Sequence, residues 1–240
     1  MKKAIIIGAS SGIGKGIALE LLKRNYTIGI TARRKDRLDE IKLIKPDAVI
    51  VKAFDSSTEE NSKNLDELSR LLGGLDLLIY NSGIGLINKE LSYEKEKKVN
   101  KLNVSGFTQV IGWGFNFFTK QKSGHIVTIS SVASEIGSGI NPSYNASKAY
   151  QANYLQGLRF KSKRIKIPIK ITDVRPGFVD TDILQGNKDR LFWVSTVEKA
   201  CRQIVKGIEN ERKIIYITKR WKLISLLIKI FPEKILSKLF

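Results

Sequence analysis

The chain is poor in two residue types that often carry chemistry, because its 240 residues include one cysteine and one histidine. With Cys201 alone, neither an intrachain disulfide nor a cysteine metal cluster is possible, and we expect no metal site. Cys201 follows the helical spacing of its apolar neighbours, which indicates a buried packing role. His125 precedes a predicted strand with no partner nearby, which disfavours a Ser-His-Asp hydrolase.

Long apolar runs free of charge are also missing, so a membrane-spanning helix is not expected. The apolar run Ala4–Ile7 near the start is too short for a signal peptide. We therefore expect a cytoplasmic protein, with peripheral attachment to the inner face of a membrane as the alternative.

Acidic residues are scarce beside basic ones, 23 against 42, which gives a formal net charge of +19 and a pI near 9.9. Such a balance favours an anionic partner, for example a membrane surface, a nucleic acid or a phosphorylated ligand. A Lys-rich solvated surface is the alternative interpretation, and it explains most of the charge. Because neither a recognition helix nor an aromatic stacking module stands out, nucleic acid is not expected as a partner.

Apolar runs that predict strands alternate along the chain with segments at helical spacing. The predicted strands are Ala4–Ile7, Tyr26–Thr31, Ala48–Phe54, Leu75–Tyr80, His125–Ile129, Ile169–Val174 and Ile214–Ile217. The predicted helices are Ile13–Leu22, segments carrying Leu38 to Ile44 and Leu65 to Leu72, one long helix ending near Lys120, Ser143–Arg164 and Thr196–Glu209. This order predicts an α/β fold with a doubly wound, Rossmann-like parallel sheet, with ligands bound at the carboxyl ends of the strands. We expect one catalytic domain over residues 1–217 and a C-terminal amphipathic helical tail over 218–240.

A glycine-rich turn links the first predicted strand to the first predicted helix. Glycine permits a tight turn and a close approach of a pyrophosphate, and the start of the helix offers free N–H groups to phosphate. A P-loop is excluded because Gly16, not Ser or Thr, follows Lys15. A turn needed only for packing remains the alternative. The expected phosphate contacts come from Gly8, Ser10, Ser11, Gly12, Ile13 and Gly14.

The second predicted strand ends at Thr31 without the acidic residue that usually binds the ribose 2′-hydroxyl of NAD. Arg33 is placed to face a 2′-phosphate, with Arg34 as a helper, so NADP(H) is favoured and NAD(H) remains possible. In the alternative interpretation both arginines are simply exposed.

Polar residues also follow the third and fourth predicted strands. Asp55 is a candidate either to bind the adenine amino group or to cap the following helix, and the sequence leaves both open. Asn81 and Gly83 are candidates to line the adenosine half of the site.

Tyr144 and Lys148 form the sharpest motif, because positions i and i+4 share one face of a helix. A nearby ammonium stabilises tyrosinate, so we expect the pKa of Tyr144 to lie below its ordinary value of about 10. Ser131 ends the fifth predicted strand and is a candidate to polarise a substrate carbonyl; Ser130 is the weaker candidate. Asn103 is a candidate to hold a water that connects Lys148 to solvent. An ordinary polar helix face is the alternative.

The sixth predicted strand leads into a Pro176-Gly177 turn, which is followed by Val179 and Thr181. Thr181 is a candidate to bond the nicotinamide carboxamide. We expect residues 178–195 to form a substrate lid, made apolar by Phe178, Leu184, Leu191, Phe192 and Trp193.

Together these motifs resemble the short-chain dehydrogenase/reductase family, in its short single-domain form, over roughly residues 3–217. The resemblance rests on the Gly8–Gly14 loop, Asn81-Ser82-Gly83, Asn103, Ser131, Tyr144, Lys148 and Pro176-Gly177, in the family's order and spacing. It implies a catalytic tetrad of Asn103, Ser131, Tyr144 and Lys148, and a homodimer or homotetramer packed through the helix that carries Tyr144. Two departures from the family pattern are Ile7, where Thr is frequent, and Tyr80 and Ser82, which replace two residues of an Asn-Asn-Ala-Gly run.

The activity implied is the NADP(H)-dependent interconversion of a carbonyl and a secondary alcohol. Tyr144 gives the proton, Ser131 holds the oxygen and Lys148 tunes Tyr144. The apolar lid favours an apolar or lipid-like substrate. The alternative is a catalytically silent nucleotide-binding protein with a regulatory or scaffold role, with or without attachment to a membrane surface.

Residues 218–240 combine basic and apolar side chains. Lys222, Ser225 and Lys229 fall on one helical stripe, and Pro232 is placed to start a second short helix. A basic amphipathic segment with Trp and Phe suits an anionic membrane interface. Packing of the tail over the active site or against a subunit would bury the same apolar face, and the sequence leaves both open.

Overall fold

The computed structural model describes residues 1–182, 184, 193–228 and 230–236. Seven parallel strands form one sheet in the order β3-β2-β1-β4-β5-β6-β7. The strands are β1 (Lys3–Ile7), β2 (Thr27–Ala32), β3 (Val49–Ala53), β4 (Leu77–Tyr80), β5 (Gly124–Ile129), β6 (Ile169–Pro176) and β7 (Ile214–Ile217). The predicted doubly wound parallel sheet is therefore confirmed.

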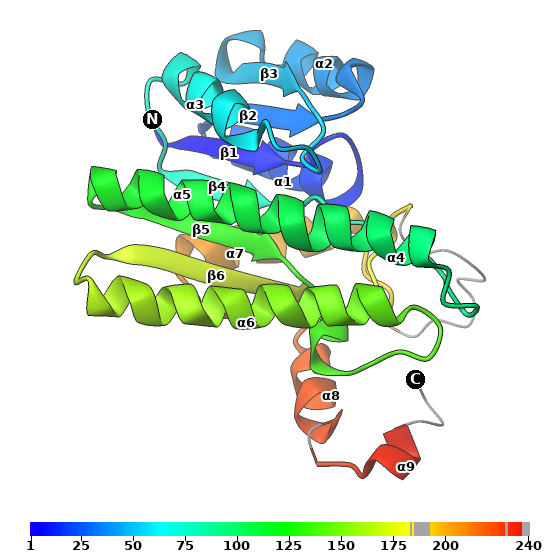
Figure 1. The fold of residues 1–240 in the computed structure, drawn as a ribbon. Helices are drawn as coiled ribbons and strands as arrows, with labels where there is room; N and C mark the ends of the chain where they lie inside the picture. Colours follow the sequence, from blue (N-terminus) through cyan, green and yellow to red (C-terminus); the bar gives the residue numbers. More distant parts are fainter. Residues whose placement is uncertain (183, 185–192, 229, 237–240) are drawn as a thin grey trace.

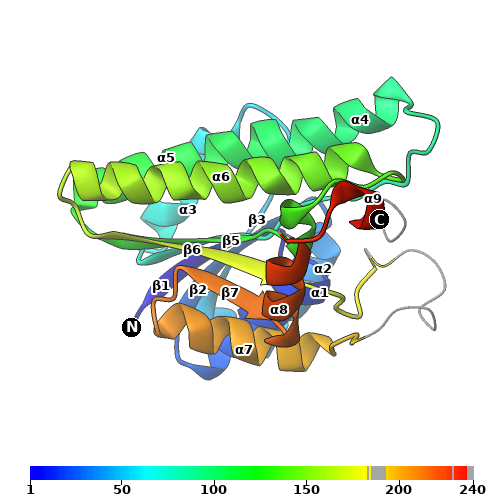
Figure 2. The ribbon, with the colours of Figure 1, turned by 90° about the horizontal axis from the view of Figure 1, so that it is seen from below.

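Helices cover both faces of this sheet, as Figures 1 and 2 show. The helices are α1 (Gly12–Lys23), α2 (Lys35–Ile44), α3 (Asn61–Leu71), α4 (Tyr93–Asn100), α5 (Phe107–Gln121), α6 (Pro142–Arg164), α7 (Val197–Glu209), α8 (Arg220–Ile228) and α9 (Glu233–Leu236). The shorter helical segments are η1 (Pro46–Ala48), η2 (Lys101–Gly106) and η3 (Val132–Glu135). Helices α3 to α6 lie on one face, and α1, α2 and α7 lie on the other (Figure 2).

The two faces of the sheet carry separate apolar cores, which explains why the strands read as continuous apolar runs. In β1, Ala4 and Ile6 belong to the core beneath α1 and α7, while Ile5 and Ile7 belong to the core beneath α3, α5 and α6. Successive side chains of a strand point to opposite faces, so a strand covered on both sides must be apolar at every position.

The predicted long helix before β5 is interrupted. It consists of α4, a π-helical segment η2 and α5. At Gly106 a Cβ atom would overlap the carbonyl of Ser56, so the helix approaches the loop after β3 at a distance that only glycine permits. The buried Tyr80 hydroxyl donates a 2.8 Å hydrogen bond to the carbonyl of Leu102 inside the π segment. π-Bulges of this kind often mark functional sites, and this one contains Asn103.

The strand order reverses between β1 and β4, the point where ligands bind in open α/β sheets. Gly8 directly follows β1 and Asn81 directly follows β4. Their neighbours at the same edge are the residues after β2, β5 and β6. The fold therefore brings the loops that carry the predicted site residues to one edge of the sheet.

The segment after β7 packs on the domain through Trp221 and Ser225, the buried residues of α8. Trp221 of α8 is 4% exposed, and its indole lies where a Cβ of Gly177 would be. Beyond this anchor, Leu223, Leu226 and Ile230 are 64%, 51% and 77% exposed. The start of α8 thus packs against the domain, while much of its apolar surface stays uncovered. Both interpretations of the tail, a membrane interface and packing over the active site or against a subunit, stay predictions. None of the described helices is both long and apolar enough to cross a membrane.

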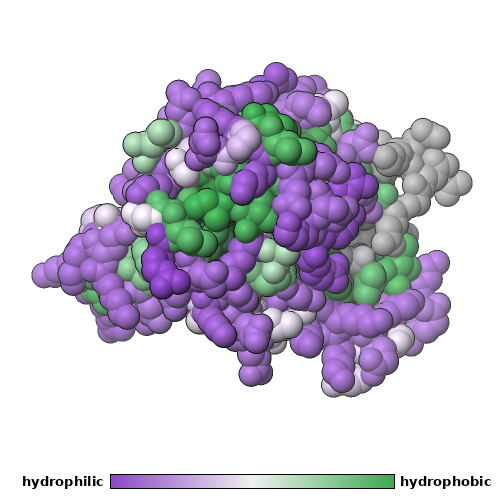
Figure 3. All heavy atoms as spheres, turned by 90° about the horizontal axis from the view of Figure 1, so that it is seen from above, coloured by the Kyte–Doolittle hydropathy of each residue, from purple (hydrophilic) through white to green (hydrophobic). Residues whose placement is uncertain are grey.

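The opposite end of the molecule carries a smaller apolar patch. Figure 3 looks down on the edge formed by β3, α2 and α3 and shows apolar side chains gathered in the middle of a hydrophilic face. Exposed apolar residues on these helices are Leu43, Ile44 and Leu71, at 79%, 61% and 56%.

Candidate active site

The glycine loop has the backbone geometry that its sequence predicts. Gly8 and Gly12 have φ angles of +86° and +52°, in the region that favours glycine. A Cβ at Gly14 would overlap the carbonyl of Gly8, and the Asn81 side chain donates a 2.7 Å hydrogen bond to that same carbonyl. Asn81 thus fixes the loop, and the glycines let it pack closely as it leads into the start of α1, where free N–H groups suit a phosphate.

The end of β2 places one arginine beside this loop. Arg34 donates hydrogen bonds of 3.3 Å and 3.1 Å to the hydroxyls of Ser10 and Ser11. All three residues line a cavity of about 460 Å³. Arg33 is exposed at the strand end and does not line this cavity. Arg34, expected as the helper, therefore makes the closer contact with the loop.

Asp55 follows β3 as expected, but it does not cap a helix. Its carboxylate accepts a 2.9 Å hydrogen bond from the backbone N–H of Ser57, whereas α3 begins only at Asn61. The capping interpretation is wrong because Asp55 stabilises a local turn six residues before the helix. Its role toward adenine stays a prediction.

Ser131 and Tyr144 lie together at the carboxyl end of β5. Ser131 caps the short segment η3, accepting a 3.1 Å hydrogen bond from the Ala133 N–H, and Tyr144 lies in the first turn of α6. The Ser131 hydroxyl faces the Tyr144 phenol as a hydrogen-bonding neighbour, and it opposes the larger rise in the pKa of Tyr144 that burial causes. Ser130, the weaker candidate, is buried and donates its hydroxyl proton to Asp173. Ser131 is thus the serine directed at the tyrosine.

Lys148 is buried below Tyr144, with its Nζ 5.7 Å from the centre of the phenol ring. The ammonium donates hydrogen bonds to the Ile129 carbonyl at 3.1 Å and to the Gln151 side chain at 3.2 Å. A Cβ at Gly83 would lie 3.3 Å from the same nitrogen, so Gly83 leaves room beside Lys148.

The expected lowering of the Tyr144 pKa is wrong for the protein by itself. Burial raises the pKa of Tyr144, and the Ser131 hydroxyl offsets this only in part. Burial also lowers the pKa of Lys148 to about 8, against an opposing effect of the Asp173 carboxylate. The reason is that burial withdraws water from both charged forms, phenolate and ammonium alike.

Asn103 is fully buried and connects the loop after β4 to helix α6. Its side-chain oxygen accepts from the Ile84 N–H at 3.0 Å, and its amide donates to the Ile84 carbonyl at 2.9 Å and to the Ser147 hydroxyl at 3.0 Å. Its main-chain carbonyl accepts a 2.8 Å bond from Gln151, which contacts Lys148. Asn103 and Lys148 are therefore linked through Gln151, a residue that the sequence analysis missed although it lies three positions after Lys148.

The loop after β6 crosses over the glycine loop. A Cβ at Gly12 would lie 3.0 Å from the Thr181 methyl group, which places Thr181 directly over this glycine. Val179 forms a single parallel bridge with Ser195, so both ends of the predicted lid are tied together. Phe178 and Trp193 pack against Trp221, with ring centres 5.3 Å and 6.1 Å away. Leu184 is half-buried, while Leu191 and Phe192 lie outside the described residues.

A buried charged cluster beside the site was also missed. Arg175 on β6 pairs with Asp173 at 2.6 Å and with Glu135, while the Tyr216 hydroxyl donates to Glu135 at 3.1 Å. Tyr216 in turn lies 3.0 Å from the Ser225 hydroxyl of α8. This network joins the segment after Ser131 to the C-terminal helix.

Comparison with known proteins agrees with this geometry. The family model for short chain dehydrogenases matches residues 2–191. The chain belongs to the short-chain dehydrogenase family. A curated relative, 11-beta-hydroxysteroid dehydrogenase A of Sesamum indicum, is 31% identical over the whole of this chain and 74% of its own length.

Two further matches describe the breadth of this family. An uncharacterized oxidoreductase of Mycobacterium tuberculosis is 31% identical over 88% of this short-chain dehydrogenase and 85% of its own length. A short-chain dehydrogenase from Sphingobium yanoikuyae, solved in complex with NADPH, superposes with a TM-score of 0.83 at 23% identity, covering 93% of this chain and 92% of its own. The structural match supports the fold assignment.

Proposed function

We propose that this chain is an NADP(H)-dependent oxidoreductase that interconverts a carbonyl and a secondary alcohol. The observation that carries the proposal is the Tyr144 phenol facing the Ser131 hydroxyl, with the Lys148 ammonium 5.7 Å from its ring, at the sheet edge that also holds the glycine loop. Family membership supports an oxidoreductase, and the site supports this reaction type.

A nicotinamide nucleotide fits the residues at this edge. The glycine loop turns with positive φ at Gly8 and Gly12 and leads directly into the N-terminus of α1, a geometry that suits a phosphate. When bound, the nucleotide supplies a hydride from its nicotinamide ring. Asn81 holds this loop, and Thr181 lies over it as a candidate contact to the carboxamide.

The remaining chemistry is carried by the chain's own side chains. In the direction of reduction, the carbonyl carbon gains a hydride and the carbonyl oxygen gains a proton. Tyr144 donates this proton, while Ser131 donates a hydrogen bond that stabilises the negative charge developing on the oxygen. Lys148 stabilises the tyrosinate that remains, because its positive charge lies 5.7 Å from the centre of the Tyr144 ring. Oxidation of the alcohol follows the same steps in reverse.

NADP(H) is proposed over NAD(H) on the strength of the arginines after β2. Arg34 lies within hydrogen-bond distance of Ser10 and Ser11, and Arg33 is exposed next to it. A 2′-phosphate at this position gains charge-assisted hydrogen bonds. Replacing Arg34 with alanine is expected to raise the KM for NADPH about tenfold or more, and to leave the KM for NADH nearly unchanged. An equal effect on both nucleotides would contradict the assignment.

An apolar substrate is proposed from the aromatic residues beside the site. Phe178, Trp193 and Trp221 pack together at the turn after β6, next to the loop that carries Thr181. The relative named 11-beta-hydroxysteroid dehydrogenase A acts, by its name, on a steroid, and steroids are bulky and apolar. We therefore expect turnover with apolar ketones or their alcohols.

The test is a screen for NADPH oxidation across apolar ketones, aldehydes and acyl thioesters, with NADP⁺ reduction by the matching alcohols as the reverse assay. The proposal predicts turnover of at least one apolar carbonyl. The alternative, a catalytically silent nucleotide-binding regulator or scaffold, predicts nucleotide binding with no turnover in either direction.

The assembly and the location of the protein are proposed from apolar side chains that the described structure leaves exposed. Tyr150 and Phe160 on α6 are 38% and 62% exposed, which supports a homodimer or homotetramer packed through this helix. The exposed apolar residues of α8 support a cytoplasmic protein attached peripherally to the inner face of a membrane.

A further inference from the structure

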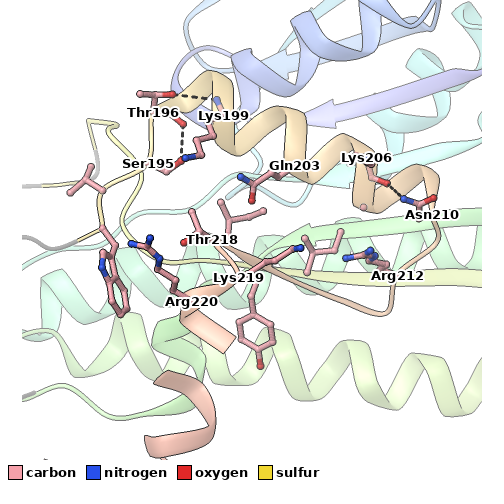
Figure 4. Close-up of a pocket in the computed structure, with 16 residues that line it drawn as sticks. Ser195, Thr196, Lys199, Gln203, Lys206, Asn210, Arg212, Thr218, Lys219 and Arg220 are labelled. Carbon is pink, nitrogen blue, oxygen red and sulfur yellow. Dashed lines mark hydrogen bonds between the residues drawn. The ribbon is translucent and has the colours of Figure 1, made fainter. Parts of the chain in front are cut away.

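A basic groove runs along the free edge of β7, and none of the proposed catalytic residues Asn103, Ser131, Tyr144 and Lys148 lines it. One wall is α7, and the other is β7 with the start of α8 (Figure 4). The groove has a volume of about 720 Å³. Its lining contains five cationic side chains and no carboxylate, namely Lys199, Lys206, Arg212, Lys219 and Arg220.

These five cations are not neutralised by the protein. Among the described residues, none of them forms an ion pair, whereas Lys15, Lys52 and Lys170 each pair with a carboxylate at 3.0 Å or less. All five residues are exposed, and Figure 4 shows Lys199 on α7 and Lys219 and Arg220 on opposite sides of the groove. Like charges gathered on low-dielectric walls create a positive potential that attracts an anion.

The chain continues from this groove directly into an exposed apolar surface. Helices α8 and α9 project from the end of the sheet formed by β7 (Figures 1 and 2). Trp221 anchors α8 at 4% exposure, so this surface is held by the fold. Its exposed apolar residues are Leu223, Leu226, Leu227, Ile230, Phe231 and Ile235.

We propose that the groove and the α8–α9 surface together bind an anionic phospholipid membrane. The groove takes the lipid phosphate, and the apolar side chains enter the interface beside it. This inference deepens the proposed membrane attachment by assigning the headgroup site to the groove that α7 and β7 form with the first residues of the tail, Lys219 and Arg220.

The observations favour a membrane over other occupants of the groove. A second copy of the chain would bring the same five cations, and a net charge of +19, against this face. A free anion would account for the cations but not for apolar side chains that are up to 77% exposed next to them. An anionic lipid surface matches both, since it presents phosphate and hydrocarbon within one interface.

The experiment is flotation of the full chain with vesicles of phosphatidylglycerol or of phosphatidylcholine. The chain is expected to float with the first and not with the second. The groove variant Lys206→Glu/Arg212→Glu is expected to lower partitioning about tenfold or more, because it removes two attractive charges near the anionic surface and adds two repulsive ones. The matched control is Lys97→Glu/Lys98→Glu on α4, where both lysines are also exposed.

A second pair of variants tests the apolar part. Leu223→Ser/Leu226→Ser on α8 is expected to weaken binding. The control Leu43→Ser/Ile44→Ser on α2, where both residues are also more than half exposed, is expected to bind normally. Retained NADPH binding checks that each variant is folded.

The outcomes separate the headgroup site in the groove from membrane attachment through the α8–α9 surface. If the α8 variant loses binding and the groove variant behaves as its control, the headgroup site is wrong and membrane attachment stands. If the unsubstituted chain does not float with phosphatidylglycerol, both are wrong. Binding of inorganic phosphate without flotation, or a change of oligomer size in the groove variant without a change in flotation, also overturns the inference.

Discussion

Tyr144 and Lys148 have shifted pKa values for the same physical reason. Both side chains are buried, so the pKa of the phenol rises and that of the ammonium falls to about 8. In the protein without a bound nucleotide, the two pKa shifts favour the neutral phenol of Tyr144 and the neutral amine of Lys148. The charge that tunes Tyr144 is therefore available only where Lys148 remains protonated.

This gives a pH prediction for catalysis. Lys148 holds its proton below pH 8 and loses it above, so kcat/KM for NADPH in the direction of reduction is expected to fall about tenfold for each pH unit above about 8. In Lys148→Arg the side chain stays charged over this range, and the fall should disappear even if the rate is lower. A profile of the unsubstituted enzyme that stays flat to pH 10 would show that the protonation of Lys148 does not matter.

His125 gives a separate prediction for stability. Burial lowers the pKa of His125 to about 4, and its Nε2 donates to the Thr172 hydroxyl at 2.8 Å, since that hydroxyl donates to the Arg212 carbonyl. The folded pKa lies below the unfolded value of 6.5, so the unfolded chain binds the proton more tightly. The contribution of His125 to the free energy of unfolding is fully present above pH 6.5. It is lost as the pH falls to 4, which lowers the free energy of unfolding by at most about 3 kcal/mol.

The measurement is the free energy of unfolding in denaturant at pH 7 and pH 4.5, for the unsubstituted chain and for His125→Gln. Because His125 is the only histidine, the variant should lose less stability between the two pH values. Parallel losses in both proteins would place the acid sensitivity in the carboxylates instead.

At the level of elements, the strands and most helices follow from the local pattern. The predicted strand boundaries fall within two residues of those in the structure, because seven short apolar runs are each bounded by turn residues. No local sequence pattern indicated that the π-helical segment η2 would interrupt the helix between α4 and α5. It depends on the contact of Gly106 with the Ser56 carbonyl and on the Tyr80 hydroxyl, which come from distant parts of the chain.

The π-helical segment η2 is expected to depend on that hydroxyl. Tyr80→Phe leaves the Leu102 carbonyl without its buried donor and should lower the free energy of unfolding by about 1–3 kcal/mol. The same variant should also reduce kcat, because η2 holds Asn103. Tyr150→Phe, which removes an exposed bond to Thr108, is the control and should change neither. Equal stability of the two variants would mean that Tyr80 does not support the π segment.

For the whole molecule, the sheet order determines which sequence motifs meet. Strand order alone brings the glycine loop, Ser131 and the Pro176-Gly177 turn to one edge, so these positions were predictable once the strands were recognised. The sequence did not predict the roles of Gln151 and of the Asp173–Arg175–Glu135 cluster. Their partners are set by how α6 and η3 pack over β6. The basic groove was missed for a similar reason, since its two walls, α7 and β7 with the start of α8, face each other only in the folded chain.

The central claim is that Tyr144 supplies the proton in a nicotinamide-dependent carbonyl reduction. The most direct measurement is the steady-state rate of NADPH oxidation with the best carbonyl from the screen, comparing Tyr144→Phe with Tyr150→Phe on the same helix. Tyr144→Phe is expected to lower kcat about a hundredfold or more and to retain NADPH binding, while Tyr150→Phe keeps the full rate. Equal rates in the two variants would contradict the account.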